Sequence, residues 1–98
     1  MSHAYIIGIG LTNFGRYHDR TVESLAAEAL GAALRDAQVE WKDVQQFYAA
    51  HVNQGVAAGQ RVITEVGPSG IPVLYVENCS AASSTALREA SMAVRSGE

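Results

Sequence analysis

A junction from strand to helix decides the fold of this chain, and it reads Pro72-Val73-Leu74-Tyr75-Val76-Glu77-Asn78-Cys79-Ser80. The β-branched and aromatic residues of its first half predict a strand over residues 72–77. A helix is predicted over residues 80–96, because small and apolar residues recur on one of its faces. Gly97 follows as a typical helix stop. The only cysteine of the chain, Cys79, therefore falls between a strand and a helix.

The residues before this junction predict a strand, a helix and a second strand. Residues 4–9 form an unbroken apolar run, which is typical of a strand buried on both faces, so we expect a central strand there. Apolar residues then recur at helical spacing over residues 22–37, with Thr21 in the N-cap position. Aromatic and small residues predict the second strand over residues 46–52. A helix between two strands indicates a parallel βαβ unit with a right-handed crossover.

A long connection that contains several glycines joins the second and third strands. It covers residues 53–70 and includes a short helix expected over residues 60–66. The whole pattern is β-α-β-(α)-β-α, which assigns the chain to the α/β class. Three parallel strands leave open sheet edges, and the central strand needs a further neighbour. We therefore expect residues 1–98 to be a partial domain that further sequence, another chain or self-association completes.

Length and composition limit the chain to one small globular domain. At roughly 100–200 residues per domain, 98 residues leave no room for a second one. The hydrophobic content of 48% excludes a disordered segment, and the net charge of -3 argues against binding to nucleic acid. No apolar stretch reaches the roughly 18 residues of a membrane span, and the amino terminus lacks the pattern of a secretory signal. We therefore expect a cytoplasmic protein.

Cys79 is the strongest candidate for chemistry. A single cysteine excludes an internal disulfide and cannot alone build a structural zinc site. Ligands of open α/β sheets bind beyond the carboxyl ends of the strands, and free N–H groups at a helix start stabilise a thiolate. Such a thiol can hold an acyl group as a thioester, and the small residues 80–84 would let a substrate approach the backbone. The alternative is a buried cysteine that serves packing only.

Other motifs give weaker signals. A glycine pair follows the first strand in Gly8-Ile9-Gly10, but Asn13 stands where a dinucleotide fingerprint needs its third glycine. The three histidines show no metal-ligand spacing, so no metal site is expected. Of these, His51 ends a predicted strand on the same sheet edge as Cys79, which makes it the histidine of interest.

Around the cysteine the sequence resembles the active-site region of thiolases, most closely the acetyl-CoA acetyltransferases and the lipid-transfer-type thiolases. The resemblance is carried by Asn78-Cys79-Ser80-Ala81-Ala82-Ser83-Ser84-Thr85-Ala86-Leu87 and by Val94-Arg95-Ser96-Gly97-Glu98. It extends to Ile6-Ile7-Gly8-Ile9-Gly10 and to Gly70-Ile71-Pro72-Val73. It covers nearly all of the chain but only the amino-terminal part of a family subunit.

This resemblance implies a fold, a reaction and a set of site residues. The fold is thiolase-like, and this chain would supply the first three strands and their helices. Cys79 would attack an acyl-CoA thioester and carry the acyl group, for Claisen condensation or for thiolysis of a 3-ketoacyl-CoA. Asn78, Ser80, Ala82 and Ser83 would bind substrate beside it. No cofactor is implied beyond the coenzyme A thioesters that serve as substrates.

The resemblance also implies partners, and two positions of this sequence differ from the family pattern. Family members dimerise through the strand at residues 73–77, so a second copy or a complementary thiolase chain is expected. Some members associate with an OB-fold and zinc-ribbon protein or with an acyl-CoA hydratase. The family's activating histidine, acid and oxyanion-hole groups belong to the carboxyl-terminal half, so no residue here takes those roles. Ala81 and Ala82 stand where the family usually carries Ser or Thr and then Gly, which alters the turn beside the cysteine.

Two alternatives stay open from the sequence. One is a non-catalytic thiolase-like subunit or fragment, in which Cys79 only packs and the chain serves assembly with a larger partner. The other is a thiolase-fold aldolase of steroid or fatty side-chain degradation, in which the cysteine need not be the nucleophile. A thiol that reacts selectively with acyl-CoA would favour the acyltransferase over both.

Overall fold

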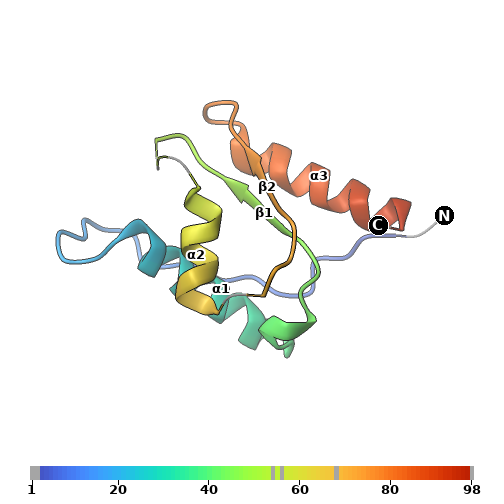
Figure 1. Cartoon of the computed structure of the whole chain (residues 1–98), viewed down its shortest axis with the longest axis horizontal. Coiled ribbons are helices and arrows are strands. Elements are labelled where there is room, and N and C mark those ends of the chain that lie inside the picture. Colours follow the sequence, from blue (N-terminus) through green and yellow to red (C-terminus); the bar gives the residue numbers. More distant parts are fainter. Residues whose placement is uncertain (1–2, 54, 56, 68, 98) are drawn as a thin grey trace.

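The computed structural model of the chain describes residues 3–53, 55, 57–67 and 69–97. The elements of these residues follow the order expected for an α/β protein (Figure 1). They are α1 (Val22–Ala37), the 3-10 turn η1 (Trp41–Asp43), β1 (Phe47–Ala50), α2 (Ala58–Val66), β2 (Val73–Val76) and α3 (Ala82–Ser96). The α/β class predicted from the sequence is confirmed.

Local signals explain the boundaries of α1, which match the prediction. The Thr21 hydroxyl oxygen accepts a hydrogen bond from the Ser24 N–H at 3.0 Å and so caps the first turn. At the other end, Gln38 adopts a left-handed conformation with φ of 58°, and its N–H bonds to carbonyl oxygens of the last turn. Arg35 places a positive charge near the negative end of the helix dipole.

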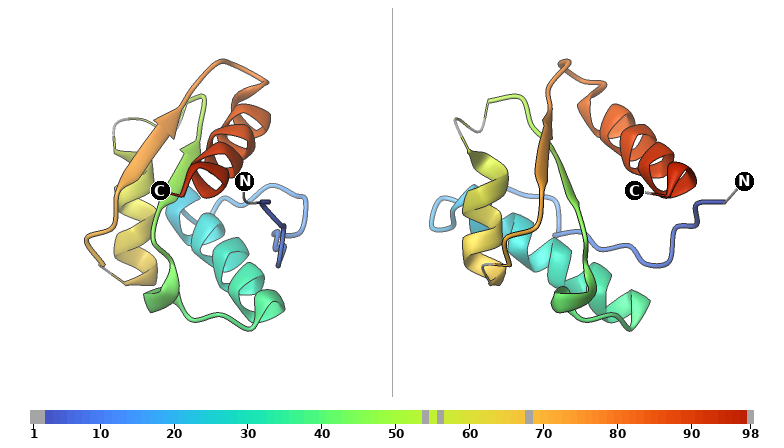
Figure 2. Two further views of the ribbon diagram at one scale, coloured as in Figure 1. Left: turned by 90° about the vertical axis from the view of Figure 1, so that its right-hand side faces the viewer. Right: turned by 45° about the vertical axis from the view of Figure 1, so that its right-hand side comes forward.

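The two strands of the described sheet are parallel and lie between layers of helices. Their register pairs Phe47 with Val73 and Ala50 with Val76. Helices α2 and α3 lie on opposite sides of the two strands, as the turned views show (Figure 2), and α1 contacts α2. The connection between the strands is thus a parallel crossover through α2. Both strands are shorter than the predicted ranges 46–52 and 72–77.

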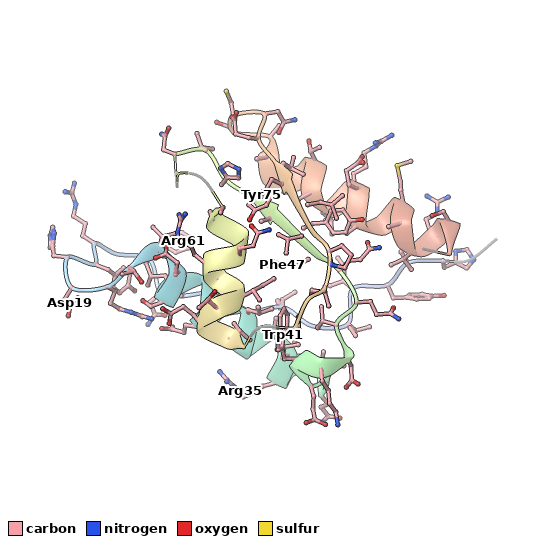
Figure 3. All side chains as sticks on the ribbon, viewed as in Figure 1. Asp19, Arg35, Trp41, Phe47, Arg61 and Tyr75 are labelled. Atoms are coloured by element: carbon pink, nitrogen blue, oxygen red, sulfur yellow. The ribbon has the colours of Figure 1, made fainter. Side chains whose placement is uncertain are left out.

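The most buried side chains come from α2 and α3, the helices that contact the strands. They are Ala58, Val62 and Ile63 in α2 and Ala82, Ala86 and Ala93 in α3. Gly59 lets α2 approach the sheet, because a Cβ atom there would lie 2.8 Å from Val73 Cγ1. Beyond α2, the Trp41 indole N–H donates to the Gly67 carbonyl oxygen at 2.6 Å, and the ring meets Phe47 edge to face (Figure 3). The contacts of α2 and α3 therefore hold β2 in place, and this fixes the start of the turn that leads from β2 into α3.

The amino-terminal run, predicted as a central strand over residues 4–9, is not a strand in the described structure. It runs against α1, where a Cβ atom on Gly8 would lie 2.5 Å from a carbonyl oxygen of that helix. The Ile9 N–H donates to the Asp36 carboxylate at 3.0 Å rather than to a neighbouring strand. Ile6 remains 71% exposed. The prediction was wrong because burial on both faces needs paired neighbours, and the described residues pair only β1 with β2.

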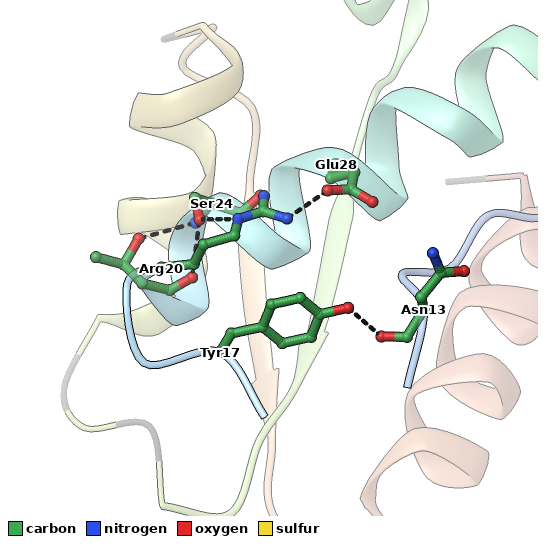
Figure 4. A network of polar contacts seen from close by, with 6 residues as sticks. Asn13, Tyr17, Arg20, Ser24 and Glu28 are labelled. Atoms are coloured by element: carbon green, nitrogen blue, oxygen red, sulfur yellow. Dashed lines mark hydrogen bonds and ion pairs between the residues drawn. The ribbon is translucent and has the colours of Figure 1, made fainter. Parts of the chain in front are cut away.

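The connection from this run to α1 is held by its own polar contacts (Figure 4). The Tyr17 hydroxyl donates to the Asn13 carbonyl oxygen. The Arg20 guanidinium donates to the hydroxyl and carbonyl oxygens of Ser24 and to the Glu28 carboxylate. These contacts fix the direction in which the chain enters α1.

Candidate functional site

The single cysteine lies in the turn between β2 and α3, at the carboxyl ends of the strands. Cys79 is exposed and adopts a left-handed backbone conformation with φ of 59°. A side chain raises the energy of that conformation by roughly 1–2 kcal/mol, so the surrounding contacts must hold it. Among the described residues, the thiol does not pack into the core. The structure therefore places the thiol at the strand-to-helix position expected from the sequence.

Hydrogen bonds on both sides of the cysteine fix this turn. The Cys79 N–H donates to Oε2 of the Glu77 carboxylate at 3.0 Å. The Cys79 carbonyl oxygen accepts the Ala82 N–H at 3.2 Å. The side-chain amide of Asn78 donates to the Thr85 hydroxyl at 2.9 Å and so ties the turn to the beginning of α3. The backbone of the cysteine is thus connected both to the residue that follows β2 and to the helix.

Helix α3 begins at Ala82, two residues after the predicted start at Ser80. The start is delayed because the hydrogen bonds of the turn occupy the intervening residues. The N-cap residue is Ala81, which has no side-chain oxygen to cap the first turn. The Ala82 N–H already donates to the Cys79 carbonyl oxygen, so within the described residues the N–H groups of Ser83 and Ser84 are the ones that face no helix partner and can bond to a polar group beside the turn.

The structure separates the predicted substrate-binding residues into two groups. Asn78, Ser80 and Ser83 are exposed on the turn and at the start of α3. Ala82 is only 4% exposed and contributes to the core instead. Ser83 also lines an open cavity of about 570 Å³ between α1, β1, α3 and the amino-terminal run. Cys79 does not line this cavity, so the cavity is separate from the cysteine turn.

His51, the predicted histidine of interest, follows β1 and contacts β2. Its ring stands edge to face against the Tyr75 ring, with centroids 5.7 Å apart. Its Nδ1 atom is buried and has no hydrogen-bond partner among the described residues. Tyr75, which sequence reasoning did not single out, also reaches α2, because its hydroxyl oxygen accepts the Gln60 N–H at 2.9 Å. The sequence signal for Tyr75 was only an aromatic residue in a strand.

A charged pair fastens α2 to α1. Nε of Arg61 lies 2.6 Å from Oε1 of Glu23. The hydrogen bond from the Arg61 guanidinium is the main reason that the pKa of the Glu23 carboxyl lies below its ordinary value of 4.5. The pair therefore links the helix that covers β2 to the long first helix, and no pattern in the sequence indicated it.

The described residues contain neither a metal-binding cluster nor a helix that could span a membrane. Among these residues, His, Cys, Asp and Glu side chains do not gather in groups of three or more that could hold a metal ion. The helices of the described part of the chain are too short or too polar to cross a membrane.

A solved structure shares this fold. The protein is similar to 3-oxoacyl-(acyl-carrier-protein) synthase III from Aquifex aeolicus, with a TM-score of 0.77 over 91% of this chain and 30% of that one. The two sequences are 16% identical, so this likeness concerns the fold alone.

Curated relatives share more of the sequence. Acetyl-CoA acetyltransferase from Methanocaldococcus jannaschii is 35% identical over 99% of this chain. Sterol carrier protein 2 from Homo sapiens is 35% identical over 99% of the chain, and non-specific lipid-transfer protein-like 2 from Caenorhabditis elegans is 33% identical over 95%. The chain spans 26%, 18% and 23% of the lengths of these three relatives, respectively.

The match to a protein family covers almost the whole chain. Residues 4–98 match the family described as Thiolase, N-terminal domain. This range includes the cysteine turn and every described helix and strand. The thiolase-like fold and the resemblance expected from the sequence are thereby confirmed. The chain belongs to the thiolase family and matches part of its amino-terminal domain.

Proposed function

We propose that this chain carries the nucleophile of a thiolase-type acyl-CoA C-acyltransferase, and that Cys79 is that nucleophile. The observation that carries the proposal is an exposed cysteine with φ of 59° in the turn from β2 into α3, within residues that match a thiolase domain. A strained turn that presents a side chain beyond the strands is a recurring way to display a nucleophile. The name of the acetyl-CoA acetyltransferase relative agrees with this chemistry.

The proposed reaction begins with acyl transfer to the thiol. The Cys79 thiolate attacks the carbonyl carbon of an acyl-CoA, and a new C–S bond forms to the cysteine. The C–S bond to coenzyme A breaks, and its electron pair leaves on the coenzyme A sulfur, which takes up a proton. The uncapped first turn of α3 supports this assignment, because free N–H groups at a helix start stabilise an anion nearby.

The acyl group on the cysteine has two proposed fates. In Claisen condensation it passes to the carbanion of a second acyl-CoA. In the opposite direction, cleavage of a 3-ketoacyl-CoA leaves its acyl group on the thiol, and coenzyme A then removes it. We assign the acid and the base of these steps to no residue of this chain. The exposed residues Asn78, Ser80 and Ser83 are our candidates for contacts with the acyl-CoA.

The proposal includes an assembly and a location. A second copy or a complementary thiolase chain would complete the catalytic unit, and a hydratase or an OB-fold and zinc-ribbon protein would be a further partner. Coenzyme A thioesters are the small molecules that the reaction needs. We place this activity in the cytoplasm.

Mass spectrometry after incubation with acetyl-CoA tests the nucleophile. We expect an acetyl group on the peptide that contains Cys79. Cys79→Ala should abolish this modification, and Cys79→Ser should lose most of it, because a hydroxyl is a far weaker nucleophile near neutral pH. Ser91→Ala, further along α3 and outside the turn, is the matched control and should keep it. An acetyl group on another residue, or one that persists in Cys79→Ala, would contradict the assignment.

A non-catalytic thiolase-like subunit is the second candidate. It is favoured by the names of two relatives, a lipid-transfer protein-like protein and a sterol carrier protein. This alternative expects Cys79 to remain unacylated while the chain binds another chain. Acylation of Cys79 in the experiment above would therefore exclude it.

A further inference from the structure

We infer that Glu77 is a positioning residue for Cys79, whose carboxylate holds the backbone of the cysteine in its left-handed conformation. The inference rests on the proposed function and deepens it, because it concerns the residue that holds the nucleophile. It starts from one contact, in which Oε2 of Glu77 accepts the Cys79 N–H at 3.0 Å. An ionised acceptor makes a stronger hydrogen bond than a neutral one.

Glu77 is well placed to transmit the position of the sheet to the cysteine. It follows Val76, which is paired with Ala50 in the parallel register. The sheet therefore fixes the backbone from which the Glu77 side chain extends. The hydrogen bond to the Cys79 N–H then connects that fixed point to the strained residue two positions later.

A comparison with Gln38 shows why Cys79 needs such a contact. Gln38 has nearly the same conformation, with φ of 58°, and its N–H bonds to the Arg35 and Leu34 carbonyl oxygens at the end of α1. That arrangement is a common helix end, in which the preceding turn supplies the acceptors. Cys79 follows a strand, so no preceding helical turn offers a carbonyl oxygen to its N–H. The Glu77 carboxylate supplies the acceptor instead.

The remaining contacts of the turn connect it to α3 rather than to the sheet. The Cys79 carbonyl oxygen accepts the Ala82 N–H, and the Asn78 amide bonds to the Thr85 hydroxyl, so both contacts lead to α3. Loss of the Glu77 contact would leave the turn tied to the helix but would remove the acceptor of the Cys79 N–H. Acyl transfer depends on fixed geometry between the thiol and its surroundings, whereas alkylation by a small reagent does not.

Nuclear magnetic resonance of the Cys79 amide tests the contact directly. In E77A we expect the amide proton to shift upfield and to exchange with solvent about three- to tenfold faster, because its acceptor is gone. E77Q keeps an oxygen acceptor and should stay within about twofold of the natural protein. E89A removes an acidic residue that bonds to Arg88 on α3, and it should leave the Cys79 amide unchanged. Thermal unfolding shows whether each variant is folded. If E77A is unfolded, E77D is measured in its place.

Acylation measurements separate this inference from the proposed function. Acetylation of Cys79 by acetyl-CoA should slow in E77A by about the same three- to tenfold factor and recover in E77Q. Alkylation by iodoacetamide should change little in either variant. A Cys79 amide that is unaffected by E77A, or an E77Q variant that behaves like E77A, would overturn the role of Glu77. If the amide pattern holds while the natural protein is never acylated, the nucleophile proposal fails and the backbone role of Glu77 stands.

Discussion

Two apolar runs of this chain have similar compositions and different structures. Residues 4–9 and β2 are both rich in aliphatic residues and contain a tyrosine, yet only β2 is a strand. It pairs with β1 along its whole length and contacts both α2 and α3. The amino-terminal run contacts α1 and leaves Tyr5 and Ile6 exposed by 78% and 71%. The difference teaches that apolar composition permits a strand, whereas a partner on the sheet edge creates one.

The same difference matters for the cysteine turn. Cys79 follows the run that the sheet holds, so its strained conformation begins from a fixed backbone. Had the cysteine followed the amino-terminal run, no paired strand would have oriented it. Substitutions in α2, which packs on the paired strands, should therefore have larger effects than matched substitutions in the amino-terminal run.

The largest expected effect comes from adding a side chain to Gly59. Its Cβ would lie 2.8 Å from Val73 Cγ1 and 3.1 Å from Ala49 Cβ, and both residues belong to the paired strands. Because these strands cannot move apart easily, Gly59→Val should lower the free energy of unfolding by about 2–3 kcal/mol. Urea denaturation at one fixed protein concentration measures the change.

Gly8 is the matched position in the amino-terminal run. Its Cβ would come even closer to other atoms, 2.5 Å from the Ala33 carbonyl oxygen. We nevertheless expect Gly8→Val to cost less than about 1 kcal/mol, because an unpaired run can shift away from α1. Gly31→Ala, in the interior of α1, controls for glycine replacement itself and should stabilise by about 0.5–1 kcal/mol. Equal costs at Gly8 and Gly59 would break the comparison and show that the run is held as firmly as β2.

Truncation of side chains gives a smaller effect of the same kind. Val62 is 6% exposed in α2, whereas Ile7 is 67% exposed in the amino-terminal run. Val62→Ala should cost about 1.5 kcal/mol, at about 0.8 kcal/mol for each buried carbon group removed. Ile7→Ala removes more atoms but should change the free energy of unfolding by less than about 0.5 kcal/mol. Thermal and urea unfolding of the two variants, measured together, would contradict this view if Ile7→Ala were the more damaging.

The sequence allowed accurate prediction where the signals are local. The apolar spacing of α1 and the Thr21 cap lie within one segment, so its bounds were predicted correctly. The amino-terminal strand was predicted wrongly because its formation depends on pairing with distant residues, which an apolar run does not specify. The start of α3 was missed by two residues because a hydrogen-bonded turn and a first helical turn have similar sequences.

The candidate site likewise has features with local sequence signals and features that depend on the three-dimensional arrangement. The place of Cys79 was predictable because strand and helix periodicities meet there, but its left-handed conformation and the Glu77 contact depend on side-chain geometry. The burial of Ala82 had a signal, since it lies four residues before Ala86 on the same helix face. The contact between His51 and Tyr75 had none, because it depends on the register of two strands.

The smallest expected effect concerns the ion pair between Arg61 and Glu23, which links α2 to α1. The Arg61 guanidinium lowers the pKa of the Glu23 carboxyl below 4.5, so the ionised form stabilises the folded protein. This contribution is present above the pKa of the unfolded chain and is lost as the pH falls through the lower folded-state pKa. The difference in unfolding free energy between the natural protein and Glu23→Gln should therefore be largest near neutral pH and shrink below pH 4.5.

Arg61→Gln should give the same loss of pH dependence, and added salt should weaken the effect because the pair is partly exposed. A difference that stays constant from neutral to acid pH would mean that the pair does not contribute to holding α2, and packing at Gly59 and Val62 would then account for the firmness of this region.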